Sequence, residues 1–231
     1  MQQKMKIAKV TKETHDTVTL SLKGAEQIPF KPGQFIMIEL LRQEKIPKRA
    51  YSISSSPTRT NFLEITIKEM PDGWISKILN TVKDGEELNV SGPFGHFVFD
   101  EEKMPEIVML AAGSGIAPFR CFCQYVQDKK LSTKIIFAYA NKTTGDIIFE
   151  KQLKEFAKKL KNMELILTLS REEKAGYRSG RIDEQLIGEI VAKKKNAYYF
   201  ICGPPKMVEA TKAMLIQNGI EKEKVKVEVF G

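Results

Sequence analysis

The pattern of apolar residues changes near residue 100, and this change limits the fold more than any other feature. Before it, short runs alternate apolar and polar residues, which is the period of strands with one buried face. After it, continuous apolar runs alternate with amphipathic segments, as in parallel strands covered by helices. With 231 residues the chain has room for two ordinary domains. We predict one domain over residues 1–102 and a second over residues 103–231, without a long linker.

The first domain is predicted to be a six-stranded antiparallel β-barrel. Its strand-like runs are rich in β-branched residues and are separated by turn sequences such as "KPGQ" and "KDGE". One short helical segment, residues 73–80, interrupts them. The predicted strands cover residues 6–13, 17–23, 34–40, 49–54, 62–69 and 87–92.

The second domain is predicted to be a doubly wound α/β domain with a five-stranded parallel sheet. Its predicted strands cover residues 106–112, 134–140, 163–170, 197–203 and 224–230. Its predicted helices cover residues 118–129, 147–160, 183–191 and 205–219. In open parallel sheets, ligands bind outside the carboxyl ends of the strands. Candidate site residues are therefore sought at those ends.

The first parallel strand runs into "AAGSGIAP", residues 111–118. Gly113 and Gly115 allow a tight turn and a close approach of the backbone to a ligand. Pro118 then opens a helix, whose unpaired N–H groups can bind a pyrophosphate. The third glycine of the common dinucleotide motif is absent. The alternative is a plain glycine-rich connection between a strand and a helix.

Two further strand ends carry candidates of the same kind. The third strand ends in Ser170 and is followed by Arg171, which can hold a 2′-phosphate, whereas a carboxylate would suit a free 2′-hydroxyl. The alternative is a charged loop with incidental arginines. The fourth strand ends in "ICGPP", where Cys202 is predicted to face the ligand crevice. The alternative for Cys202 is a small buried hydrophobe.

The barrel half contains "RAYSIS", in which Arg49, Tyr51 and Ile53 share one face of a strand and Ser52 faces the other way. A guanidinium beside a flat aromatic ring suits a ligand with both a phosphate and a planar ring. Further along, "DGWISKIL" offers Gly73 and Ser76 at the start of a helix, which predicts a second phosphate site. Ordinary sheet packing and a plain helix cap are the alternatives.

In combination, these motifs resemble the ferredoxin–NADP⁺ reductase superfamily over nearly the whole chain. "RAYS" resembles the flavin motif R-x-Y-S, "SGPFGHF" the G-P-x-G turn, "GSGIAP" the G-T-G-I-A-P loop and "CGPP" the C-G-P loop. "EVFG" resembles the aromatic C-terminal segment of the flavohaemoglobin-type reductases. The chain lacks the cysteine motifs of a plant-type [2Fe–2S] domain and of the dihydroorotate dehydrogenase electron-transfer subunit, and no globin domain precedes the barrel. We therefore expect electrons to leave to a separate molecule.

The resemblance implies a flavin site in the barrel. Arg49 would pair with the flavin phosphate, Tyr51 would stack on the isoalloxazine and Ser52 would hydrogen-bond near N5. Phe230 would cover the ring face that the nicotinamide must reach. The remaining flavin contacts, along the ribityl chain and the pyrophosphate, would come from Ile53, Thr66, Ile67, Lys68, Gly73, Trp74, Ile75 and Ser76.

The resemblance also implies a nicotinamide nucleotide site in the second domain. Cys202 would lie near the hydride-bearing carbon, and Ser170 with Arg171 would select NADP. Tyr51, Ser52, Cys202 and Phe230 are the predicted catalytic residues. The predicted cradle for the nucleotide consists of Gly113, Ser114, Gly115, Ile116, Pro118, Gly203 and Pro204.

The predicted activity is transfer of hydride from NAD(P)H to bound FAD, followed by delivery of single electrons to an acceptor such as ferredoxin or flavodoxin. FAD is favoured over FMN because the Gly73–Ser76 segment offers a second phosphate site. NADP is favoured, with NAD as the alternative. Two other functions are a flavin reductase that releases reduced flavin, and an electron-relay subunit of a larger complex.

Charge and cysteine content suggest the partner and the setting. A formal net charge of +8 favours an acidic protein partner, although a lysine-rich solvated surface is the alternative. The lysines are scattered and not interleaved with aromatics, which argues against a nucleic-acid-binding module. The apolar runs are too short to span a bilayer, and the first residues carry no export signal. Three cysteines without metal-site spacing predict a reducing, cytoplasmic setting and no metal.

Overall fold

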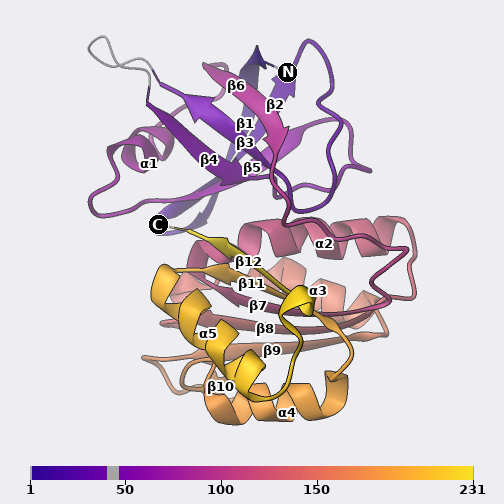
Figure 1. Cartoon of the computed structure of the whole chain (residues 1–231). Coiled ribbons are helices and arrows are strands. Elements are labelled where there is room, and N and C mark those ends of the chain that lie inside the picture. Colours follow the sequence, from indigo (N-terminus) through magenta and orange to yellow (C-terminus); the bar gives the residue numbers. More distant parts are fainter. Residues whose placement is uncertain (1, 41–46, 231) are drawn as a thin grey trace.

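This computed structural model describes residues 2–40 and 47–230 of the chain. These residues contain two six-stranded sheets. The N-terminal sheet is antiparallel and the C-terminal sheet is parallel, with helices on both of its faces (Figure 1). The predicted fold class is confirmed. The parallel sheet has one strand more than predicted, because the two residues Arg178–Ser179 pair with its outer edge.

The antiparallel sheet closes into a barrel. Its strand order is β4-β3-β6-β1-β2-β5, and an antiparallel bridge between Ile53 and Ile65 joins the two ends. The inward-facing side chains, among them Leu20, Ile36 and Ile38, are fully buried. Each contributes roughly 1.5–3 kcal/mol by leaving water. The elements are β1 (Gln2–Thr14), β2 (Thr17–Gly24), β3 (Phe35–Glu39), β4 (Lys48–Ser52), β5 (Leu63–Lys68), α1 (Trp74–Leu79) and β6 (Glu87–Phe94).

The parallel sheet has the strand order β10-β9-β8-β7-β11-β12. The chain starts in the middle at β7, moves outward through β8 and β9, and then crosses back to β11. The order therefore reverses between β7 and β11, the usual place for a ligand crevice. The strands are β7 (Glu106–Ala112), β8 (Lys134–Asn141), β9 (Met163–Leu169), β10 (Arg178–Ser179), β11 (Tyr198–Gly203) and β12 (Val225–Val229).

Four helices cover this sheet, and a separate apolar core lies on each of its faces. They are α2 (Ala117–Asp128), α3 (Glu150–Lys159), α4 (Glu184–Lys194) and α5 (Pro205–Gln217), and the 3₁₀ turns are η1 (Gly113–Ile116), η2 (Thr144–Asp146) and η3 (Lys222–Lys224). Helix α3 begins three residues later than predicted, because Phe149 has a left-handed φ of 62°. Such a backbone cannot continue a right-handed helix.

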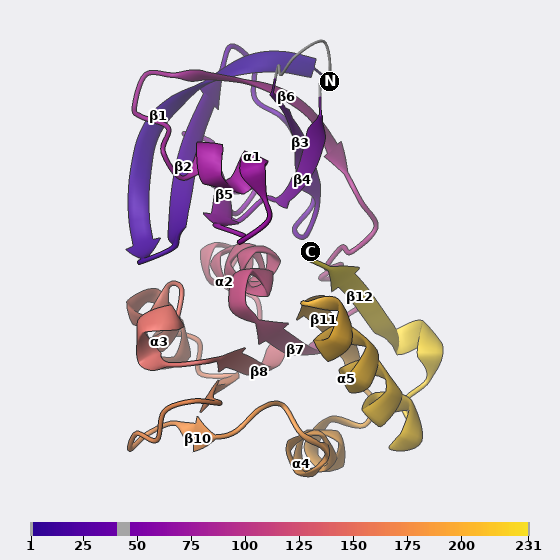
Figure 2. The ribbon, with the colours of Figure 1, turned by 90° about the vertical axis from the view of Figure 1, so that its left-hand side faces the viewer.

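Helix α2 lies between the sheet and the barrel, as two perpendicular views show (Figures 1 and 2). Its apolar side packs on the parallel sheet, and polar side chains on its other side bind the barrel. In the described residues, no helix combines the length and apolar character needed to cross a membrane.

Candidate functional site

Two loops are in direct backbone contact where the strand order reverses, and we refer to this expected ligand position as the crevice. A Cβ atom built on Gly115 would lie 2.1 Å from the carbonyl oxygen of Cys202 and 2.8 Å from the nitrogen of Gly203. Only glycine permits this contact. Gly113, in contrast, has a φ of 54° and open space around its Cα, so a ligand can approach its backbone. Gly115 thus allows the two loops to pack closely, and the backbone of Gly113 stays open to a ligand.

Hydrogen bonds hold the crevice loops in place. The buried Tyr139 donates from its hydroxyl to the carbonyl of Gly113, at 2.9 Å. The backbone N–H of Phe230 donates to the carbonyl of Gly203, also at 2.9 Å. Phe230 is half-buried against the core on this side of the sheet. The structure therefore brings three predicted segments together: the Gly113 turn, the Cys202–Pro204 loop and Phe230.

Ser52 reaches this crevice from the barrel. Its Oγ donates to Oε2 of Glu228 at 2.8 Å, and Glu228 lies beside Cys202 in the register of β12 with β11. Burial raises the pKa of Glu228 from its ordinary value of 4.5 to about 7. Burial, with the Glu228 charge adding to it, raises the pKa of the Cys202 thiol well above 9. Cys202 is therefore a neutral thiol at physiological pH.

Glu228 was not among the residues predicted from the sequence. Its one signal is a carboxylate near a strand end, in the stretch "VKVEVF" that alternates apolar and charged residues. That signal points to no partner, because Ser52 lies 176 residues away in the sequence.

Arg49 and Tyr51 lie on β4, on the barrel side of the site. The Arg49 side chain is exposed, and its Nη1 donates only to the carbonyl of Lys48, at 3.0 Å. It forms no ion pair with any residue that the structure describes, so its charge is available to an anion. The Tyr51 ring is half-buried against the barrel core, and burial raises its pKa to about 12. A free guanidinium beside this ring fits a phosphate and a planar group.

The predicted residues on β5, and Ile53, have their side chains engaged within the barrel. Thr66 Oγ1 lies 3.1 Å from Thr19 Oγ1 and donates to Ser54 Oγ at 3.0 Å. Ile53 and Ile67 are fully buried, and Lys68 Nζ pairs with Asp16 at 2.8 Å. The ribityl contacts expected of these residues stay a prediction.

The Ser76 side chain forms hydrogen bonds that stabilise the start of α1. Ser76 Oγ accepts from the N–H of Met70 at 3.0 Å and donates to the carbonyl of Gly73 at 2.8 Å. Trp74 packs partly buried against the barrel core, which contains Ile75. The Ser76 hydroxyl therefore already has two partners, and its predicted contact with a pyrophosphate would have to replace or share them.

Ser170 and Arg171 are exposed just beyond β9. Their backbone N–H groups donate to the carbonyls of Asn141 and Lys142 at 3.0 and 2.8 Å, which ties this loop to the end of β8. Arg171 makes no ion pair within the described part of the chain. The carboxylate of Glu172 accepts from the N–H of Thr144 at 2.6 Å and from its hydroxyl at 3.1 Å. Its negative charge is thus already bound by two donors.

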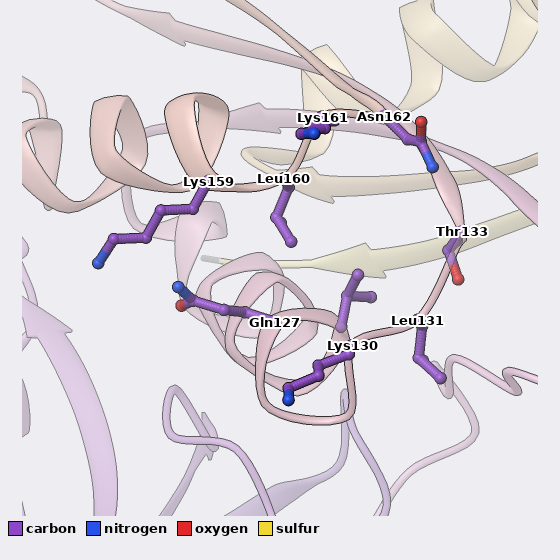
Figure 3. A pocket seen from close by; sticks show the side chains of 9 residues that line it. Gln127, Lys130, Leu131, Thr133, Lys159, Leu160, Lys161 and Asn162 are labelled. Atoms are coloured by element: carbon purple, nitrogen blue, oxygen red, sulfur yellow. The ribbon is translucent and has the colours of Figure 1, made fainter.

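A cavity of about 460 Å³ lies elsewhere, where α2 and α3 end (Figure 3). Lys130 and Lys159 come to it from the ends of these two helices. None of the predicted site residues lines it. We therefore place the candidate site at the crevice and not in this cavity.

Two family models together cover most of the chain. The oxidoreductase FAD-binding domain matches residues 4–99, and the oxidoreductase NAD-binding domain matches residues 109–213. The gamma subunit of sulfhydrogenase 1 from Pyrococcus furiosus is 32% identical over 206 residues, covering 87% of this chain and 68% of that protein. The chain belongs to the ferredoxin–NADP⁺ reductase superfamily.

Other superfamily members match along nearly the full chain. The glycine betaine monooxygenase reductase subunit of Pseudomonas aeruginosa is 31% identical over 234 residues, which are 98% of this chain. The chain spans only 64% of that relative's length. The FAD/NAD-binding domain of nitric oxide dioxygenase from Vibrio cholerae matches with a TM-score of 0.89 at 21% identity, over 99% of this chain and 98% of that one. The ferredoxin NADP⁺ reductase from Neisseria gonorrhoeae, solved with FAD and NADP, matches with a TM-score of 0.86 at 20% identity, over 99% and 98%.

These matches confirm the predicted superfamily and the predicted cofactors, FAD and a nicotinamide dinucleotide. The roles of individual residues stay predictions. Their positions agree with the two matched ranges. The FAD-binding range contains Arg49, Tyr51 and Ser52, and the NAD-binding range contains Gly113 and Cys202.

Proposed function

We propose that this chain is an NAD(P)H-dependent flavoprotein reductase that passes electrons to a separate acceptor. The observation that carries the proposal is the bond between Ser52 and Glu228, which joins the flavin strand to the carboxyl edge of the nicotinamide-binding sheet. Hydride transfer from a nicotinamide to a flavin requires the two reacting rings to be in contact. This contact supports a position between the two domains at which such rings would meet.

The residues present fit both cofactors. Arg49 would hold a flavin phosphate, Tyr51 would lie against the ring, and the Gly113 turn would take the nucleotide beside the start of α2. Bound FAD would supply the ring that accepts a hydride and gives up electrons one at a time. The protein supplies binding, orientation and a local electrostatic environment.

The chain's own polar groups would serve orientation and proton storage. The pKa of Glu228, near 7, lets its carboxyl group hold or release a proton at neutral pH. The Ser52 hydroxyl, fixed by Glu228, would be directed toward the flavin ring. Cys202 would contribute an uncharged, polarisable surface next to the nicotinamide. No side chain needs to abstract a proton from carbon.

The acceptor is proposed to be a small acidic electron-transfer protein, either ferredoxin or flavodoxin, in the cytoplasm. The support is the net charge of +8, which attracts an acidic partner. The names of two relatives, the glycine betaine monooxygenase reductase subunit and the propane 2-monooxygenase reductase component, describe reductases of oxygenase systems. The similarity to a sulfhydrogenase gamma subunit favours one alternative, a relay subunit within a larger complex.

The decisive experiment is an absorption spectrum of the purified protein, identification of the released flavin by mass, and anaerobic titration with NADPH. We expect one FAD per chain that stays bound through gel filtration and is bleached by NADPH. Loss of flavin on gel filtration would support a flavin reductase instead. A bound flavin that neither NADPH nor NADH reduces, with no ferricyanide reduction by the isolated chain, would indicate a relay subunit.

A further inference from the structure

A row of polar side chains on α2 binds the FAD-binding barrel. Arg120, Gln124 and Asp128 follow one another at intervals of four residues, so they share one face of the helix. They contact, in the same order, the barrel segment that continues from β4, which contains Ser54, Ser56, Thr58 and Arg59. We call this contact the α2 seam.

Gln124 and Asp128 make simple polar contacts with the barrel. The fully buried Gln124 accepts at Oε1 from the N–H of Ser56, at 2.9 Å. Asp128 accepts two parallel bonds from Arg59, at 2.8 and 2.9 Å, and one from the Thr58 hydroxyl at 2.6 Å. Arg59 and Asp128 lie at the exposed end, where solvent weakens their attraction.

Arg120 occupies the buried end and joins three elements. Its Nη1 donates to the carbonyl of Ser54 at 3.1 Å and to Glu64 Oε2 on β5 at 2.6 Å. Its Nε donates to Gln152 on α3 at 2.6 Å, and its guanidinium carbon lies 4.5 Å from the centre of the Phe149 ring. With 9% of its surface exposed, Arg120 is nearly removed from water. A charge in such a place is retained only when it is fully paired.

The residues that Arg120 connects adjoin both predicted cofactor sites. On the barrel side, Ser54 lies two residues after Ser52. On the other side, Arg120 lies two residues after Pro118, on the first turn of the helix that follows the Gly113 turn. A shift of this contact would move the two ligand-binding segments relative to each other. Arginine suits the position because its planar fork reaches separate acceptors in fixed directions, which a lysine amine cannot do.

We propose that Arg120 is a positioning residue that fixes the FAD-binding barrel against the NAD-binding domain and thereby aligns the nicotinamide with the flavin. The claim that Arg120 aligns the two cofactors rests on the proposed function. The claim that Arg120 fixes the two domains against each other does not, because it applies to the protein with or without cofactors.

Domain placement is tested by measuring the distance between two spin labels, introduced by Lys23→Cys on the barrel and Lys212→Cys on α5. Both positions are exposed, whereas the native Cys121, Cys123 and Cys202 are buried and react poorly with the label. We expect a narrow distance distribution in the parent protein and a broader or shifted one in Arg120→Gln. Arg181→Gln, the same change at an exposed position without a described partner, is the control and leaves the distribution unchanged.

Alignment is tested by stopped-flow reduction of the holoenzyme with NAD(P)H. Arg120→Gln is expected to slow flavin reduction at saturating nicotinamide by roughly tenfold to a hundredfold, since small misplacements of reacting groups have effects of this size. Flavin affinity and nicotinamide affinity stay within about twofold, which separates positioning from binding. Arg120→Lys restores only part of the rate, and Arg59→Gln at the exposed end has a smaller effect.

Glu64→Gln weakens the same contact from the barrel side and is the second variant if Arg120→Gln does not fold. Unchanged distances in both variants would overturn the placement, and broadened distances with an unchanged reduction rate would overturn the alignment. A parent protein that NAD(P)H does not reduce would refute the proposed function instead, while the distance measurement would still decide the role of Arg120.

Discussion

The hydroxyl of Ser52 and the carboxylate of Glu228 meet at 2.8 Å, although one belongs to the first domain and the other to the last strand of the second. The contact places a titratable group with a pKa of about 7 between the two cofactor-binding domains.

Glu228→Gln is predicted to flatten the dependence of stability on pH. The folded-state pKa lies above the ordinary value, so between pH 4.5 and 7 the folded protein binds more protons than the unfolded chain. Stability from this group is therefore full below pH 4.5 and falls as the pH rises to 7, by about 3 kcal/mol in total. Urea unfolding of wild type and Glu228→Gln at pH 5 and pH 7.5 measures the difference. Parallel profiles for the two proteins would show that Glu228 ionises normally.

Cys202→Ser is predicted to fold and bind flavin but to be reduced more slowly by NAD(P)H. The thiol is fully buried in the apolar core at the end of β11, and its backbone contacts Gly115, so the change is confined to this end of the sheet. A buried hydroxyl without a partner lowers stability by about 1–3 kcal/mol. Stopped-flow reduction isolates hydride transfer from later electron delivery. A reduction rate equal to that of wild type would leave Cys202 with a packing role only.

Arg49→Ala is predicted to lose most of its flavin during purification while it stays folded. A charge-assisted hydrogen bond of this class contributes roughly 1.5–3 kcal/mol, or about one to two decades of affinity. The flavin-to-protein absorbance ratio and the thermal unfolding curve together measure the effect. Lys23→Ala, at an exposed position on β2, is a matched loss of one positive charge away from the predicted flavin contacts. Full flavin occupancy in Arg49→Ala would mean that the phosphate lies elsewhere.

Arg171→Ala is predicted to reduce the preference for NADPH over NADH. The Arg171 guanidinium has no described ionic partner, and two hydrogen bonds from Thr144 hold the Glu172 carboxylate. One charged contact to a 2′-phosphate shifts selectivity by roughly tenfold to a hundredfold. The ratio of kcat/KM for the two cofactors gives the answer, with Arg181→Ala as the control. If wild type already prefers NADH, the assignment of Arg171 is wrong.

Reduction of an acidic ferredoxin or flavodoxin is predicted to slow steeply as salt is added. The chain has 37 basic and 29 acidic residues, and the resulting net charge of +8 would steer such a partner. Flavin reduction by NADPH, measured in the same salt series, corrects for effects on the enzyme itself. Acceptor reduction that does not change with ionic strength would rule out electrostatic steering.

The strands and helices that pack by simple periodicity could be predicted from the sequence, and so could the superfamily. Strand β10 could not, because two residues carry no periodic signal and depend on pairing with β9. Glu228 was missed because a site formed between distant segments leaves no local pattern. The role of Arg120 could not be predicted either, because its partners on the barrel become visible only when α2 is placed in three dimensions.

The α2 seam has a consequence for any attempt to recombine this protein with its relatives. Helix α2 belongs by its apolar side to the second domain, but its polar side is fitted to residues 54–64 of the first. A chimera joined near residue 100 would therefore combine residues 54–64 of one protein with the α2 helix of another, and the polar contacts between them would be lost. Exchanging residues 54–64 together with the foreign helix would keep the pair intact. Residues 54–64 and helix α2 should therefore be exchanged together, although they belong to different domains.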